Sequence, residues 1–265
     1  MLKLGFNWRD ILRAPRLALS LQRMWIQLVG LTFGLLFYLL LTYLGMMAAG
    51  YSLKTAWMQN GLLPCFFAIG DQFPWYSWLL TGIGSLILVF SLMITNTAVS
   101  RAIYMTSKGN SFYSWKEAFA FAFRKIASIL LTPISLIVLI GFMVLGALII
   151  GLLAKIPFIG ALGFSLFTVF WILGALILVF FVLATIVATL LVPSVLATTD
   201  EDAFEAIFQS FSIVWSHPWR FIFYEGLTLI LSLLALGGMA FFMKQALFIV
   251  NYLFAAFIGG DFVNL

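Results

Sequence analysis

The chain has 265 residues, of which 64% are hydrophobic and 9% are charged, and its mean hydropathy is +1.16. Soluble domains average about 45–50% apolar and about 25% charged residues, so this composition excludes a soluble globular protein. The net charge of +5 comes from Lys and Arg residues that stand mostly beside the apolar runs. This placement indicates contact with anionic lipid at a membrane surface and argues against a nucleic acid partner.

The apolar runs are long enough to cross a lipid bilayer. A hydrocarbon core of about 30 Å needs about 20 apolar residues in a helix, and several runs exceed that length without a charge. A transmembrane barrel would show short alternating strands instead. The sequence therefore predicts an all-α fold, a polytopic transmembrane helical bundle of about six spans, which forms a single integral membrane domain over residues 1–265.

The first predicted span covers residues 25–50 and follows a basic N-terminal segment. Residues 1–24 carry five basic residues against Asp10 alone. The apolar run behind them is longer than the roughly 7–15 residues of a signal-peptide core, so we expect a retained anchor with its N-terminus in the cytoplasm. Residues 51–77 contain helix breakers and many aromatic residues, which predicts a loop at the outer headgroup region.

Further spans are predicted at residues 78–104, 126–153 and 158–192, with a basic inner segment after the second span and a tight turn after the third. Residues 220–265 fit either two spans that turn near Lys244 or one long helix with an interfacial end. With six spans and both termini inside, eleven of the fourteen Lys and Arg residues belong to inner segments. This bias supports the orientation by the positive-inside rule.

An amphipathic helix is predicted between the fourth and fifth spans. Asp202 and Glu205 form a D-x-x-E capping box, and the acidic residues from 200 to 205 are interpreted as charge that complements a helix N-terminus. Apolar residues behind the box recur on one helical face. They are Phe204, Ile207, Phe208, Phe211 and Trp215. A helix of this kind is typical of one that lies along the inner membrane surface.

The same design recurs upstream. Ser114 and Glu117 form an S-x-x-E capping box, and residues 7–10 are a looser version of it. Each box precedes a short, half-apolar helix and then a span. We interpret the chain as three pseudo-repeats that begin near residues 7, 114 and 202, each with an interfacial helix on the inner side.

The segment 205–211, E-A-I-F-Q-S-F, stands between two spans and resembles the pattern E-A-[apolar]-x-x-S-[aromatic] of a broad family of bacterial six-span inner-membrane proteins of unknown function. That family includes the YciC-type proteins and the membrane domain attached to some glycerophosphoryl diester phosphodiesterases. The resemblance covers residues 90–240, and residues 116–122 lack the Ser of the pattern. It implies an inner-membrane module without an active site of its own, because the phosphodiesterase activity of the fused proteins lies in a separate soluble barrel.

Residues suited to catalysis or metal binding are scarce. The chain has one histidine, His217, and one cysteine, Cys65, which excludes an internal disulfide, a cysteine metal cluster and a haem held by two histidines. We expect no enzyme, no catalytic residue, no metal site and no cofactor. Contact with lipid, a quinone or a pigment stays open, since the aromatic surface would suit each of them.

Two groups of residues within the spans are candidates for function. The polar ones are Glu225, which we expect to stay hydrated or to pair with Arg220, and Asn96, which we expect to bind a neighbouring helix. The small residues would let helix backbones approach closely, unless they only reflect the high glycine content of membrane spans. These helix-packing candidates are Gly30, Gly34, Gly141, Gly146 and Gly151.

The sequence favours a non-enzymatic integral membrane scaffold or accessory subunit that packs against other membrane proteins in a larger assembly. The alternative is a transporter or lipid-translocating protein, which needs a polar path that only Glu225, Asn96 and scattered Ser and Thr residues could supply. Expected partners are other integral membrane proteins and membrane lipids, with anionic lipid at the inner face. The expected location is the inner (cytoplasmic) membrane, with several passes and a cytoplasmic N-terminus.

Overall fold

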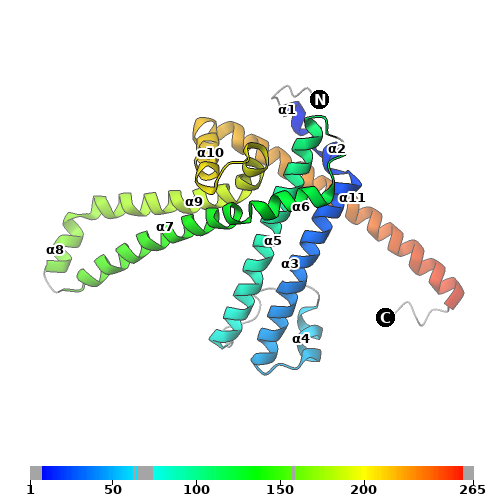
Figure 1. Ribbon diagram of the computed structural model, residues 1–265. Helices are drawn as coiled ribbons and strands as arrows, with labels where there is room; N and C mark the ends of the chain where they lie inside the picture. Colours follow the sequence, from blue (N-terminus) through cyan, green and yellow to red (C-terminus); the bar gives the residue numbers. More distant parts are fainter. Residues whose placement is uncertain (1–7, 62–63, 65–73, 111, 157–158, 259–265) are drawn as a thin grey trace. The chain divides into compact units, whose positions relative to one another are not determined.

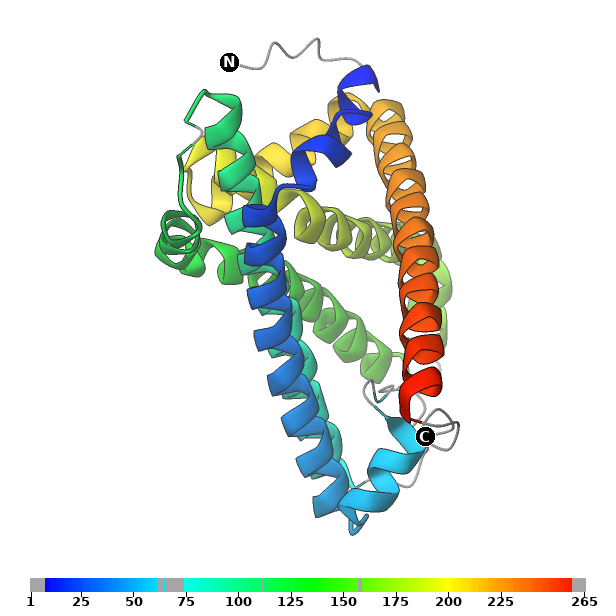
Figure 2. The same cartoon turned by 90° about the vertical axis from the view of Figure 1, so that its right-hand side faces the viewer.

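The computed structural model describes residues 8–61, 64, 74–110, 112–156 and 159–258 (Figures 1 and 2). Every regular element in this part of the chain is a helix, and no strand is found in it. The prediction of an all-α fold is therefore confirmed for these residues. Predictions that concern Asn7, Cys65 and Pro157 fall outside them.

Five of the helices are long and apolar enough to cross a membrane. They are α3 (Leu21–Ala48), α5 (Trp75–Ser107), α7 (Ile126–Leu153), α9 (Thr168–Thr199) and α11 (Pro218–Ile258). The prediction of several membrane-spanning helices is confirmed at this level. The described residues supply five candidates, where the sequence led us to expect about six.

The chain divides into two compact units, one of residues 1–2 and 18–213 and the other of residues 3–17 and 214–265. The first unit holds the four spans α3 to α9 and most of α10 (Ala203–Ser216). The second unit holds α11 and two short helices of the N-terminal segment, α1 (Trp8–Ile11) and α2 (Ala14–Ala18). The three pseudo-repeats are not tested by this division and stay a prediction.

Helices α3 and α5 form an antiparallel hairpin and lie side by side in both views (Figures 1 and 2). Each ends at a glycine with positive φ, Gly50 at 93° and Gly109 at 102°. The amide of Gly50 donates to the carbonyl of Met47, and the following amide donates to the carbonyl of Met46; Gly109 and its successor repeat this pattern. These are Schellman motifs, which satisfy the last carbonyls of each helix and stop it.

The first unit has two clusters of buried apolar residues. One joins α5, α7, α9 and α10, with Ile129, Val192 and Leu196 at its centre. The other joins α3 and α5 to α6 (Trp115–Arg124). The interior of the unit therefore lies where α6 and α10 meet the spans.

The predicted fourth span is wrong at its start. The run that begins at residue 158 is not one helix, because a short helix, α8 (Ile159–Leu166), precedes α9. A Cβ built on Gly160 would lie 2.2 Å from the carbonyl oxygen of Ala154. Glycine at this position thus lets the chain fold back tightly on the end of α7. The next span, α9, begins at Thr168, directly after α8 (Figure 1).

Helix α11 decides between the two alternatives for residues 220–265, two spans or one long helix. This helix continues without a break from Pro218 to Ile258, so the described residues show no turn near Lys244. Residues 239–248 contain neither Pro nor Gly, and most of them are good helix formers, which explains the continuity. The structure therefore has the single long helix, and this accounts for the lower number of candidate spans.

Candidate functional site

Gly30 and Gly34 lie on the face of α3 that contacts α5. A Cβ on Gly30 would come within 1.7 Å of the Thr95 hydroxyl oxygen, and one on Gly34 within 2.9 Å of a Leu88 methyl carbon. No side chain fits at the first position without a shift of Thr95. These two predicted packing glycines therefore let the two spans approach closely.

Hydroxyl groups of α5 complete the contact between α3 and α5, which we call the α3/α5 seam. The Ser91 hydroxyl donates to the Gly30 carbonyl at 2.7 Å, and the Ser77 hydroxyl donates to the Gly45 carbonyl at 2.8 Å. Both serines are buried. Hydrogen bonds of this kind between membrane helices average about 0.6 kcal/mol, so they add modestly to the close packing.

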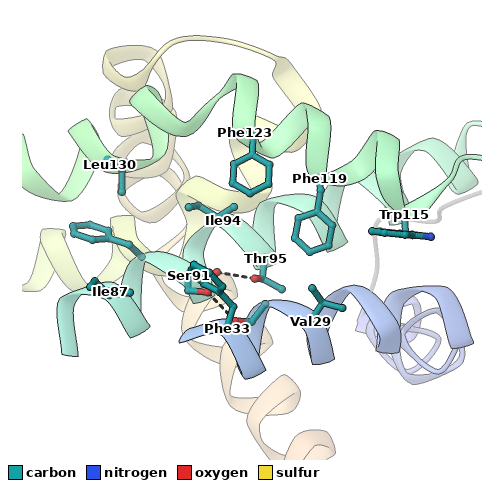
Figure 3. Close-up of a pocket in the computed structure, with 12 residues that line it drawn as sticks. Val29, Phe33, Ile87, Ser91, Ile94, Thr95, Trp115, Phe119, Phe123 and Leu130 are labelled. Atoms are coloured by element: carbon teal, nitrogen blue, oxygen red, sulfur yellow. Dashed lines mark hydrogen bonds between the residues drawn. The ribbon is translucent and has the colours of Figure 1, made fainter. Parts of the chain in front are cut away.

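A groove opens beside the seam, between α3, α5, α6 and the start of α7 (Figure 3). Its volume is about 460 Å³. Gly30 and Phe33 contribute from α3, Phe90 and Ile94 from α5, and Leu130 from α7. The lining is almost wholly apolar, and this groove is the candidate functional site.

One wall of the groove is a row of aromatic side chains on α6. Trp115, Phe119 and Phe123 recur every fourth residue and therefore share one face of the helix (Figure 3). Successive ring centroids are 6.4 and 6.1 Å apart. The predicted capping box fixes the start of this helix, since the Ser114 hydroxyl accepts from the Glu117 amide and the Glu117 carboxylate accepts from the Ser114 amide.

A basic group surrounds the C-terminal end of α9. The Lys125 ammonium donates to the carbonyls of Asp200 and Glu201 at 2.7 and 3.2 Å, and the Arg101 guanidinium donates to the carbonyl of Ala197 at 2.8 Å. Cations are favoured there because the helix dipole places partial negative charge on the last carbonyls. The Arg101 guanidinium also stacks 4.1 Å above the Phe121 ring.

Asp200 has a role that the sequence did not predict. It ends α9 in a left-handed conformation with φ 62°. Its carboxylate lies 3.0 Å from the Lys125 ammonium and 3.6 Å from the Arg124 guanidinium. Burial acts to raise the pKa of Asp200, but the hydrogen bond and charge of Lys125, with the charges of Arg124 and Arg101, lower this pKa below its ordinary value.

The face of α10 is only partly used in packing. Ile207 and Phe211 pack against the buried cluster around Leu196, and the Phe211 ring stacks on Phe180 of α9 at 6.1 Å. The other members of the predicted face are exposed, namely Phe204, Phe208 and Trp215. The carboxylate of Glu205 accepts a hydrogen bond from the Gln209 side chain.

The remaining candidate residues are not brought together. Asn96 is exposed on α5 and forms no hydrogen bond to a neighbouring helix in the described residues, contrary to our expectation. Glu225 is exposed on α11, and no ion pair joins it to Arg220 in the described part of the chain. Gly141, Gly146 and Gly151 on α7 have nothing within 4 Å of a Cβ built on them. Within the described residues, no group of three or more His, Cys, Asp and Glu side chains could hold a metal ion.

Sequence reasoning missed the groove, as well as the two cations at the end of α9. A signal for the seam was present, because Ser77 and Thr81 on α5 are four residues apart, as are Ser91 and Thr95, and so share a helical face. Nothing comparable indicated the groove, which needs four helices to form.

Five helices of the described chain are long and apolar, and they expose apolar side chains along their lengths. The buried polar side chains are small hydroxyls except for Arg23. These features define the class as a multi-pass, helical membrane protein. Comparisons with protein-family models, with curated proteins and with solved structures find no match to this chain.

Proposed function

We propose that the protein is a non-enzymatic scaffold or accessory subunit of the bacterial inner membrane, which docks other integral membrane proteins on α7. One observation carries this proposal. Residues 137–153 of α7 contain no buried side chain, yet this stretch holds Gly141, Gly146 and Gly151 with open space over each. The resemblance of residues 90–240 to a family of inner-membrane modules without an active site supports the same conclusion.

The open glycines favour a docking role for a physical reason. A glycine inside a helix costs about 0.5–1 kcal/mol relative to alanine, so three of them weaken α7 unless their small size is used. Close approach of another helix is the use that the same chain makes of Gly30 and Gly34. A helix of a partner protein on α7 would bury the open glycines in the same way.

The orientation that we propose places α6 and α10 along the inner membrane surface. Basic residues at this end of the first unit support it, namely Arg23, Arg101, Lys108, Lys116, Arg124 and Lys125. Lys54 and Lys155 belong to the opposite ends of their hairpins. With five spans the N-terminus lies in the cytoplasm and the C-terminus on the outer side.

A transporter or lipid-translocating protein is less well supported. Such a protein needs polar groups that are free to bind a substrate along a path across the bilayer. In the α3/α5 seam, the hydroxyls of Ser77, Ser91 and Thr95 already donate to backbone carbonyls. These groups stabilise the hairpin and supply no path.

Site-specific photocrosslinking tests the scaffold function. A photoreactive phenylalanine analogue at Ala147, which is exposed beside Gly146, should form adducts with the same few membrane proteins that co-purify in mild detergent. The same analogue at Leu86, exposed on α5, is the matched control and should not capture them. Gly146→Leu should abolish both capture and co-purification.

Recovery of the wild-type chain as a lone monomer would contradict the proposal, as would a Gly146→Leu variant that keeps every partner. Cysteine labelling tests the orientation independently. Lys116→Cys should react only from the inner side and Lys54→Cys only from the outer side. Labelling of each cysteine from the opposite side would mean that the proposed orientation is wrong.

A further inference from the structure

The groove between α3, α5 and α6 has the chemistry of a lipid site. We propose that it holds one acyl chain of an anionic glycerophospholipid, with the phosphate of the headgroup beside Lys116 at the Trp115 end. This inference goes beyond the scaffold function and rests on a different face of the molecule. Four properties of the groove carry it: its lining, its rigidity, its size and the charge at one end.

The lining offers little to a polar ligand. Its hydroxyl groups belong to Ser91 and Thr95, and both already donate, Ser91 to the Gly30 carbonyl at 2.7 Å and Thr95 to the Ser91 carbonyl at 2.7 Å (Figure 3). Apolar cavities do not hold water, and an unfilled void loses dispersion contacts on every side. The occupant is therefore apolar, and the most abundant apolar groups around a membrane span are lipid chains.

The walls are held in place without the occupant. Helix α6 is fixed at its start by the Ser114 capping box, and its buried residues Ala118 and Ala122 pack against Ala98 and Ala102 of α5. The floor is fixed because Gly30 and Thr95 leave no room between α3 and α5. A preformed site loses less conformational entropy on binding than one that must be ordered.

The size of the groove selects a chain rather than a helix. A volume of about 460 Å³ lies in the ordinary range for sites that take one small molecule. An α-helix with its side chains is about 10–12 Å across and would displace the walls. The lining residues extend from Ile87 at one end of the groove to Trp115 at the other (Figure 3), which suits an extended hydrocarbon chain.

The charge at the Trp115 end selects an anionic headgroup. Lys116 is exposed, its ammonium lies 5.7 Å from the centre of the Trp115 ring, and it forms no salt bridge in the described residues. The nearest carboxylate in sequence, Glu117, is engaged by the Ser114 amide. Arg124 and Lys125, further along, share Asp200. Lys116 is therefore the cation available to a phosphate, at a tryptophan of the kind that marks headgroup level.

Photoactivatable lipid tests the site in the full-length protein. The chain is reconstituted in phosphatidylcholine vesicles with a trace of phosphatidylglycerol that carries a diazirine in one acyl chain, and adducts are mapped by mass spectrometry after irradiation. We expect adducts to concentrate on Phe33, Phe119 and Phe123. Val29→Trp fills the groove and should remove most of them, whereas Leu28→Trp, on the neighbouring exposed position, should leave them unchanged.

Headgroup selectivity is measured by comparing this probe with one that carries the same diazirine chain on phosphatidylcholine. Lys116→Gln should lower the preference for phosphatidylglycerol by about fivefold, as loss of about 1 kcal/mol per surface lysine predicts, and Lys54→Gln is the control at the other end of α3. If Val29→Trp fails to fold, Ile87→Trp with its control Leu86→Trp tests the other end of the groove. Adducts spread evenly over the exposed spans, or adducts that both groove variants leave unchanged, would each overturn the proposal.

Discussion

The two hairpins of the first unit, α3/α5 and α7/α9, differ in composition and in packing, and the helices of α7/α9 are the more apolar. In the most apolar stretch of α5, 28% of the residues are buried, against 6% in that of α7. A Cβ added to Gly30 or Gly34 of α3 would meet Thr95, Leu88 or Ser91, whereas one added to a glycine of α7 would meet nothing within 4 Å. Glycines in this chain therefore pack closely against a neighbouring helix in α3 and stay open in α7.

The difference shows what makes a small-residue motif pack. Across from Gly30 and Gly34, α5 presents hydroxyl side chains that bind the exposed α3 carbonyls. Across from α7, nothing lies within 4 Å of a Cβ added to Gly141, Gly146 or Gly151, and Gly174 of α9 has the same open space. The α7 glycines therefore stay open to a partner.

The largest effect that we predict separates the two glycine sets. Gly30→Ala should destabilise the protein by about 1–3 kcal/mol, because its Cβ overlaps the Thr95 hydroxyl. Gly146→Ala should be neutral or slightly stabilising, since alanine is the better helix former and the space is open. Chemical unfolding in detergent micelles measures both free energies.

Thr95→Ala should restore part of the stability that Gly30→Ala loses, because it removes the hydroxyl oxygen and the methyl group that the new Cβ meets and leaves only the Cβ of residue 95, at 2.7 Å. Equal effects of Gly30→Ala and Gly146→Ala would show that the hairpins do not differ in packing, and the comparison would then fail.

The second prediction concerns the C-terminal end of α9, where the α7/α9 hairpin is held by charge. Lys125→Met should lower the free energy of unfolding by about 1–2 kcal/mol, because the carbonyls of Asp200 and Glu201 lose a charged donor at a helix C-terminus. Lys54→Met, at an exposed position in α4 (Leu53–Asn60) away from a helix C-terminus, is the control and should change little. The same unfolding titration measures both, and an unchanged Lys125→Met variant would contradict the role of Lys125.

A smaller effect is expected within the α3/α5 seam. Ser91→Ala removes the hydroxyl that donates to Gly30 and should cost about 0.6 kcal/mol, the average for hydrogen bonds between membrane helices. Thr189→Ala on α9, whose exposed hydroxyl bonds within its own helix, should cost less. A loss of several kcal/mol for Ser91→Ala would mean that hydrogen bonding, and not close packing, dominates the seam.

The smallest effect is a pH dependence at the end of α9. Because Lys125, Arg124 and Arg101 hold the pKa of Asp200 below its ordinary value, the stabilisation by this carboxylate is complete above the unfolded-state pKa. It is lost as the pH falls through the folded-state pKa. Asp200→Asn should therefore flatten the acid side of the stability–pH curve slightly, whereas Asp202→Asn should not. Parallel curves for Asp200→Asn and the wild type would rule out this linkage.

The positions of the first three spans follow closely from the sequence. The predicted segments 25–50, 78–104 and 126–153 overlap α3, α5 and α7, because a membrane helix satisfies its backbone hydrogen bonds within its own segment and needs only sufficient apolar length. The capping box at Ser114 was predictable for the same reason, since both of its hydrogen bonds are local. The break before α9 was not, because it depends on the close contact of Gly160 with Ala154. For α11 the sequence left two alternatives open, and the structure has the single long helix.

Sequence alone determined that this chain is helical, lies in a membrane and carries a capped amphipathic helix after its second span, since each property depends on residues close together in the chain. Tertiary structure decided which glycines are buried, that Asp200 closes α9 beside Lys125, and that an apolar groove opens beside α6. The physical reason is that packing in lipid depends on the shape of the facing helix. The periodicity of one helix does not contain that shape.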